Sequence, residues 1–100
     1  MASSPTVNTL KHLRKLGYTC AVVEKFNSFT KTRHDLFGFI DIIAIKDAQT
    51  LAVQATSRGN ISSRVKKIED SDHLSAVRDA GWHIEVHGWD KPKHRYRLKV

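Results

Sequence analysis

The chain has 100 residues, of which 40% are apolar and 8% are aromatic. This composition is typical of a globular protein and argues against a disordered one, and the length suits one modest core, so we expect a single domain over residues 1–100. Seventeen Lys and Arg residues against ten Asp and Glu residues leave a net charge of +7. Such a surplus favours a polyanionic partner, of which nucleic acid is the commonest, although an ordinary basic protein would carry the same charge.

The single cysteine, Cys20, lies in the apolar run "YTCAVV" and has no second cysteine with which to form an internal disulfide. We therefore expect a reducing compartment, the cytoplasm. No apolar run reaches the length of a signal-peptide core or of a membrane span, so we expect no association with a membrane.

The chain begins with a predicted helix and a predicted strand. Ser4 followed by Pro5 is typical of a helix N-cap and first helical position, and Gly17 is typical of a helix end. Residues 18–26 are rich in β-branched and aromatic side chains and predict a strand. The apolar positions at helical spacing are Val7, Leu10 and Leu13.

Two further strands are expected in the middle of the chain. Residues 27–36 have mixed polarity and little periodicity, and we interpret them as a loop. Residues 37–46 and 50–57 predict strands, and the short connection "KDAQ" makes them an antiparallel hairpin.

The second half of the chain predicts a helix pair. Gly59 and Asn60 open the first helix, the run "EDSD" at residues 69–72 interrupts it, and Asp72 caps a second helix that ends at Gly81. The apolar positions are Ile61, Val65 and Ile68 in the first helix, and Leu74 and Val77 in the second.

Residues 82–89 and 94–100 predict two last strands. The resulting order is helix, three strands, helix pair, two strands. An apolar sheet needs helices on its faces, so we expect an α/β fold of the layered α+β kind, with a mixed sheet flanked by helices.

A carboxylate and two polar side chains interrupt the apolar strands. Asp41 lies in "FGFIDIIAI", and Gln54 and Thr56 lie in "TLAVQATSRGN". Buried carboxylates are costly unless they are paired or bound to metal, and the hairpin would bring Asp41 close to Gln54 and Thr56. A cluster of oxygen atoms at the open end of a sheet suits a hard cation such as Mg²⁺.

Asp41, twelve intervening residues and then Gln54-Ala55-Thr56 resemble the PD-(D/E)XK nuclease signature, in which an Asp precedes Glu-x-Lys at that kind of distance. The resemblance covers about residues 10–89 and is nearest to archaeal Holliday-junction resolvases and small phage nuclease-like proteins. It implies a restriction-endonuclease-like fold with an αβββαβ core, and the expected element order is similar.

The resemblance also implies roles for these residues. Asp41 would be a metal ligand, Gln54 stands where the family has Glu, Ala55 would offer its carbonyl, and Thr56 stands where the family has Lys. The metal would be Mg²⁺, with Mn²⁺ as an alternative. Gln54 removes one negative charge from the site, and Thr56 supplies no cation, so the substitutions either keep a weaker metal site or mark a lost activity.

Other charged residues could compensate for these departures. Glu24, at the end of the first strand, is a candidate additional catalytic acid and metal ligand, with a solvated strand-end charge as the alternative. A relocated lysine is a further hypothesis, with Lys46, Lys66 and Lys67 as candidates, although most surface lysines are only solvated.

Basic segments surround the predicted site. Asn60 begins a helix whose free N–H groups could hold a phosphate. The alternative is a basic helix face that keeps the protein in solution. The expected nucleic-acid-binding residues are Lys31, Arg33, Arg58, Asn60, Arg64, Lys66 and Lys67.

Two other groups of polar residues have both a functional and a structural interpretation. His83, Glu85 and His87 share one face of a predicted strand and could hold zinc, but the alternation of a half-exposed strand explains them as well. Asp35, in "RHDLFGF", is interpreted as a turn or capping residue with Arg33 as its candidate partner. The sequence has no Gly-rich phosphate loop, Ser-His-Asp set or CxxC pair.

We therefore expect a metal-dependent DNA endonuclease, a hydrolase selective for branched structures such as Holliday junctions. The alternative is a catalytically degenerate nuclease-like module that only binds DNA, and a weaker one is a protein-binding accessory factor. The resembled resolvases act as dimers, so we expect a homodimer, in the host cytoplasm if the chain is phage-encoded. Trp82, Trp89 and Phe29 could supply an apolar patch, although core packing explains the tryptophans equally well.

Overall fold

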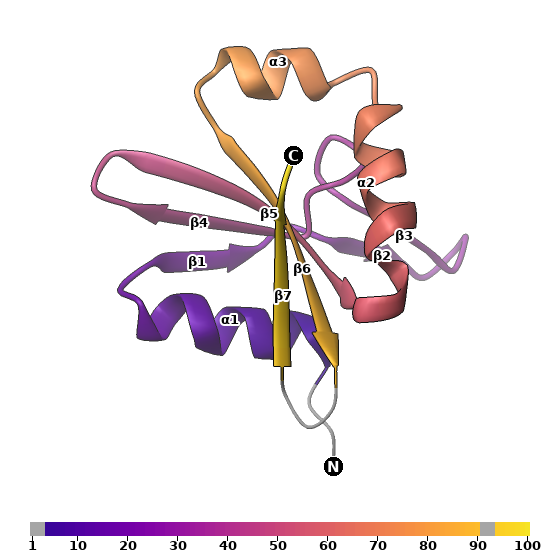
Figure 1. Ribbon diagram of the computed structural model, residues 1–100. Helices are drawn as coiled ribbons and strands as arrows, with labels where there is room; N and C mark the ends of the chain where they lie inside the picture. Colours follow the sequence, from indigo (N-terminus) through magenta and orange to yellow (C-terminus); the bar gives the residue numbers. More distant parts are fainter. Residues whose placement is uncertain (1–3, 91–93) are drawn as a thin grey trace.

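The computed structural model describes residues 4–90 and 94–100 and has an α+β architecture. A mixed sheet of five strands, in the order β1-β4-β5-β6-β7, is covered by α1 on one face and by α2 and α3 on the other (Figure 1). The predicted mixed sheet flanked by helices is therefore confirmed. The helices are α1 (Pro5–Lys15), α2 (Ile61–Glu69) and α3 (Leu74–Asp79), with a 3₁₀ turn at Arg58–Asn60, and the strands are β1 (Thr19–Val22), β2 (Lys25–Asn27), β3 (Thr32–His34), β4 (Ile42–Lys46), β5 (Gln49–Ser57), β6 (His83–Asp90) and β7 (His94–Lys99).

Strand directions in the sheet follow from the connections. β1, β4 and β5 are antiparallel neighbours, and the β4–β5 turn uses positive φ angles at Asp47 and Ala48 (49° and 67°), as two-residue hairpins require. β5 and β6 are parallel, because α2 and α3 carry the chain from the end of β5 back to the end of the sheet at which β5 begins. The expected hairpin between the second and third predicted strands is thus present as β4–β5.

The residues of β5 alternate between two cores. Leu51, Val53 and Ala55 pack with Leu13 of α1, whereas Ala52 packs with the residues beneath α2 and α3. Since alternate residues of a strand share a face, Gln54 and Thr56 belong to the α2 face.

Two local features set the starts of the long helices. The Oγ of Ser4 accepts a hydrogen bond from the N–H of Val7 (3.2 Å), as predicted for an N-cap. Gly88 of β6 leaves room for the start of α2, because a Cβ there would lie 2.4 Å from Cδ1 of Ile61. Both helices start near the end of β5, since Ser4, Asn60 and Ser57 line the same hollow. None of the helices described is long and apolar enough to cross a membrane.

The structure corrects the predicted elements at three places. The predicted strand 18–26 is interrupted at residues 23–24, and the predicted loop 27–36 contains strand β3, which pairs with β2 in a separate hairpin. All residues of both strands are exposed, so this hairpin has no buried face and leaves no apolar pattern in the sequence.

The second and third corrections concern two aspartates. Asp72 does not cap α3, whose N-cap is His73. Asp41 does not lie within a strand, because the predicted strand 37–46 begins only at Ile42 as β4 and residues 37–39 form a turn with positive φ angles at Phe37 and Gly38. Its backbone is nevertheless held on both sides, by hydrogen bonds from its N–H to the carbonyl of Val53 (2.9 Å) and from the N–H of Val23 to its own carbonyl (2.8 Å).

Candidate metal centre

Asp41 is buried at the end of the sheet, beside β5. Its Oδ2 accepts hydrogen bonds from Nε2 of Gln54 (2.8 Å) and from the N–H of Ala55 (3.0 Å). Asp41, Gln54 and Thr56 are only 4%, 3% and 5% exposed. The structure thus brings Asp41 next to Gln54, as the hairpin predicts, whereas the contact of Ala55 is made by its N–H and not by its carbonyl.

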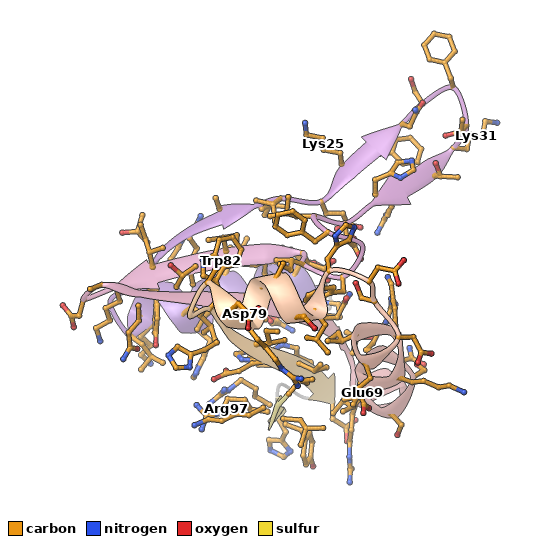
Figure 2. All side chains as sticks on the ribbon, turned by 90° about the horizontal axis from the view of Figure 1, so that it is seen from above. Lys25, Lys31, Glu69, Asp79, Trp82 and Arg97 are labelled. Atoms are coloured by element: carbon orange, nitrogen blue, oxygen red, sulfur yellow. The ribbon has the colours of Figure 1, made fainter. Side chains whose placement is uncertain are left out.

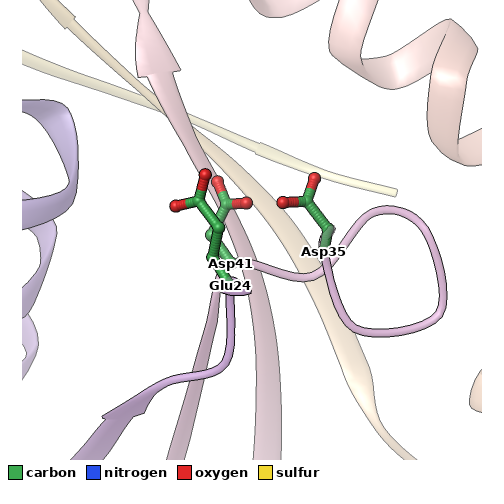
Figure 3. A group of neighbouring side chains, drawn as sticks. All are labelled: Glu24, Asp35 and Asp41. Carbon is green, nitrogen blue, oxygen red and sulfur yellow. The ribbon is translucent and has the colours of Figure 1, made fainter. Parts of the chain in front are cut away.

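Three carboxylates converge at this point. Glu24 lies between β1 and β2, and Asp35 directly follows β3. One oxygen of each of Glu24, Asp35 and Asp41 lies within 4.8 Å of the other two, and the three side chains point toward one another (Figure 3). We call these three residues the acidic cluster.

The crowding of negative charge perturbs Asp41. Burial raises the pKa of its carboxyl, a hydrogen bond with Asp35 and the charges of Asp35 and Glu24 raise it further, and the N–H of Ala55 only partly opposes them, so that the pKa is about 7. Near neutral pH the site therefore keeps a proton or needs a compensating cation.

Lys67 of α2 reaches the acidic cluster. Its Nζ lies 3.0 Å from Oδ2 of Asp35, so that of the three candidate lysines Lys67 is the one that contacts this cluster within the described residues. Lys46 is elsewhere, since its Nζ donates to the carbonyl of Leu16 (2.7 Å). Arg33 pairs with Glu24 (3.5 Å) and not with Asp35, so the partner considered for Asp35 was wrong.

A hollow of about 550 Å³ opens over the acidic cluster. Ser4, Pro5 and Thr6, at the start of α1, form part of its wall, and Asn60 and Arg64, at the start of α2, form another part. Two helix N-termini with their partial positive charge thus border the hollow, which is a favourable setting for phosphate groups.

The predicted nucleic-acid-binding residues divide into two groups. Four of them line the hollow, namely Arg33, Asn60, Arg64 and Lys67. Lys31, Arg58 and Lys66 do not. Arg58 instead pairs with Asp90 (3.3 Å), and its guanidinium lies 4.3 Å from the ring centroid of Tyr96.

The residues of the hollow fit a divalent cation. The acidic cluster offers carboxylate oxygens, the ligands that hard cations such as Mg²⁺ and Ca²⁺ prefer. Within residues 4–90 and 94–100, the Oε1 of Gln54 is buried and has no hydrogen-bond partner. A bound cation would offset the clustered negative charge and would give this oxygen a partner.

The second possible metal site is not assembled. Oε1 of Glu85 lies 2.8 Å from Nε2 of His87, but His83 is exposed at the start of β6. In the described part of the chain, the acidic cluster is the one group of three His, Cys, Asp or Glu residues with converging ligand atoms.

Asp35 is the site residue that the sequence prediction missed. Its sequence context predicts a turn or capping residue, although it is the one acidic residue between Glu24 and Asp41. That isolation in a basic stretch was the available signal, but only the β2–β3 hairpin explains how Asp35 returns to Glu24.

Comparisons with protein-family models, curated proteins and solved structures found no match to this chain.

Proposed function

We propose that this protein is a metal-dependent DNA endonuclease that acts on branched DNA. The observation that supports it most is the convergence of the acidic cluster with Lys67 in a hollow bordered by two helix N-termini. Carboxylates that hold a cation, beside cations that hold phosphates, are the groups that phosphodiester hydrolysis needs.

Glu24, Asp35 and Asp41 would hold the metal, Mg²⁺ or alternatively Mn²⁺, with Oε1 of Gln54 as a further donor. When bound, the metal would polarise the scissile phosphate and lower the pKa of a water molecule. Lys67 supplies the positive charge that Thr56 lacks, Arg33 and Arg64 bind the flanking phosphates, and the partial positive charge at the start of α1 attracts the DNA strand.

The fold is compatible with the PD-(D/E)XK resemblance. The order α1-β1-β4-β5-α2-β6 follows the αβββαβ order of that family once the β2–β3 hairpin, α3 and β7 are counted as additions. Asp41 and Gln54 also stand side by side, as the first and second signature positions would. The partner would be DNA, the active form a homodimer and the location the cytoplasm.

A second candidate function is a DNA-binding module without cleavage. It is favoured by the contact between Asp41 and Gln54, in which an amide N–H group occupies one carboxylate oxygen that a metal would otherwise use. Loss of the family's Glu-x-Lys pair at Gln54 and Thr56 favours the same alternative.

The test is incubation of the protein with a four-way junction, a flap and a linear duplex, each with Mg²⁺, Mn²⁺ or EDTA. Isothermal titration calorimetry with Mg²⁺ alone measures metal binding in the parent and in Asp41→Asn. The proposal expects cleavage of the branched DNA with metal, none with EDTA, and metal binding that Asp41→Asn removes. DNA binding without cleavage would favour the second candidate function. A protein that binds neither metal nor DNA would exclude both candidate functions.

A further inference from the structure

The β2–β3 hairpin projects from the body of the protein (Figures 1 and 2). It pairs only with itself and forms a separate two-stranded sheet. Glu24 immediately precedes β2 and Asp35 immediately follows β3, so the base of the hairpin is part of the acidic cluster. A molecule that contacts the hairpin would therefore also approach the hollow.

Two phenylalanines are displayed on this hairpin. Phe29, in the turn between the strands, is 97% exposed, and Phe26 in β2 is 63% exposed. Single exposed apolar residues are common, but an aromatic ring that is almost fully exposed at the end of a projecting hairpin is placed to enter a partner.

The turn that carries Phe29 is organised by its own side chains. Oδ1 of Asn27 accepts hydrogen bonds from the N–H groups of Phe29 (2.9 Å) and Thr30 (3.3 Å). The hydroxyls of Thr30 and Thr32 lie 2.6 Å apart. Because the turn is fixed in advance, less conformational entropy is lost when the ring binds.

The charge of the hairpin favours a nucleic acid. Residues 25–34 contain Lys25, Lys31 and Arg33 and no acidic residue. Aromatic side chains among cations are the usual surface for unpaired bases, since the rings stack on the bases and the cations bind phosphates.

We propose that the β2–β3 hairpin recognises the branch in DNA, with Phe29 stacking on an unpaired or splayed base. This inference rests on the proposed nuclease function and adds what selects the substrate. Phe29 lies five residue steps from Glu24 along the chain, and these steps span at most about 16 Å at ~3.3 Å per residue. At ~3.4 Å per nucleotide, the cut would fall within about five nucleotides of the branch.

The experiment compares the parent with Phe29→Ala and Phe29→Trp. Binding to a flap, a four-way junction and a linear duplex is measured in EDTA by fluorescence anisotropy, so that no cleavage is needed. A 2-aminopurine at the branch reports base stacking. Since Phe29 is almost fully exposed, both variants should fold, which thermal unfolding checks.

The expected result for Phe29→Ala is an affinity for branched DNA about tenfold lower, with less than a twofold change for the linear duplex. Phe29→Trp should retain the affinity and quench the 2-aminopurine. Lys31→Ala is the matched control for charge, and it should weaken the binding of branched and linear DNA by the same factor.

Several results would overturn the inference. Equal effects of Phe29→Ala on branched and linear DNA, or no effect on either, would do so and leave the nuclease proposal intact. Dissociation of a dimer by Phe29→Ala without DNA would assign the ring to a second copy of the chain, and Phe29-dependent binding to phosphatidylserine vesicles would assign it to a membrane. Conversely, the parent protein could fail to cleave any DNA while Phe29→Ala selectively loses its affinity for branched DNA. That result would reject the nuclease proposal and support the recognition of the branch by the hairpin.

Discussion

Two buried carboxylates on opposite faces of the same sheet, Asp41 and Glu85, have opposite surroundings. Both are less than a tenth exposed. Burial raises the pKa of Glu85, but the hydrogen bond to His87 and the charges of His87, Arg97 and Lys99 outweigh it, so that the pKa lies below its usual range. Burial also raises the pKa of Asp41, but here the hydrogen bond with Asp35 and the charges of Asp35 and Glu24 add to it, so that the pKa is about 7.

The contrast separates a structural carboxylate from a candidate functional one. Glu85 has its compensating groups within the fold, and it lies beside Val53 on the face that α1 covers. Asp41 is held by two N–H donors, but the cations nearby contact the other two acids, since Lys67 pairs with Asp35 and Arg33 with Glu24. Burial alone therefore does not distinguish the two carboxylates, whereas burial among like charges in a hollow is found only for Asp41 of the two and makes it the candidate.

The largest expected effect is that of Asp41→Asn on cleavage. Removal of a group that holds charge in the transition state lowers rates by about 10²–10³-fold, and loss of the central metal ligand should cost at least as much. DNA affinity should remain within about twofold, because Arg33, Arg64 and Lys67 are unchanged. Cleavage rates with Mg²⁺ and anisotropy in EDTA measure the two quantities, and a variant that cuts as fast as the parent would exclude Asp41 as a ligand.

The complementary change on the other face is Glu85→Ala. It removes the carboxylate that contacts Nε2 of the fully buried His87, so we expect a loss of about 3 kcal/mol in the free energy of unfolding. Metal affinity at the acidic cluster should not change. Urea unfolding measures the loss, with Glu85→Gln as the control that keeps the shape of the side chain. A Glu85→Ala variant as stable as the parent would remove the distinction between the two carboxylates.

The pH dependence of stability should differ in sign between the two sites. The pKa of Asp41 is higher in the folded protein than its ordinary value of 3.8, so its contribution to stability is complete below about pH 4 and is lost as the pH rises through about 7. The pKa of Glu85 is lowered, so its contribution is present above its ordinary pKa and is lost as the pH falls below that range.

Urea unfolding in EDTA at pH 5 and pH 8 measures this difference. Between these pH values the free energy of unfolding of the parent should fall by about 3 kcal/mol more than that of Asp41→Asn, since about two pH units lie below the raised pKa and each is worth about 1.4 kcal/mol. Mg²⁺ at pH 8 should restore part of the loss in the parent only. Parallel pH profiles of the two proteins would contradict the raised pKa.

Local signals in the sequence predicted much of the fold. Ser4 and Pro5 locate the start of α1, and the short turn after Lys46 fixes the β4–β5 register that places Asp41 opposite Gln54. These features depend on residues that are neighbours in the sequence or on the alternation of buried and exposed positions, and both are visible as patterns in the sequence.

The rest of the site depends on contacts between distant residues. The β2–β3 hairpin buries no face, so the sequence pattern of its residues predicts a loop and carries no sign that Asp35 returns to Glu24. Whether Lys66 or Lys67 contacts Asp35 depends on which face of α2 is turned toward Asp35. The helical spacing of the sequence does not determine that orientation.

The smallest expected effects come from the two departures from the family signature. Gln54→Glu would place a fourth carboxylate about 3 Å from Asp41, where the amide now donates a hydrogen bond. Without metal, this variant should lose about 1 kcal/mol of stability through like-charge repulsion. With metal, a carboxylate binds a hard cation better than an amide does, so calorimetry should show Mg²⁺ binding about tenfold tighter. Unchanged Mg²⁺ affinity would mean that Gln54 is not a ligand position.

Thr56→Lys should change less, because Lys67 already brings a positive charge to the acidic cluster. Thr56 is 5% exposed, so a lysine there must extend into the hollow and is expected to compete with Lys67 for Asp35.

If the chain is a degenerate nuclease, Gln54→Glu with Thr56→Lys should create or raise Mg²⁺-dependent cleavage of branched DNA. If it is an active nuclease adapted to Gln54, Thr56 and Lys67, the double variant should cut at the parental rate or more slowly. Single-turnover cleavage of parent, single and double variants, each checked for folding, separates the two outcomes. Lys67→Ala is the decisive control, since only an active nuclease that relies on the relocated lysine loses cleavage with it and regains cleavage when Thr56→Lys is added.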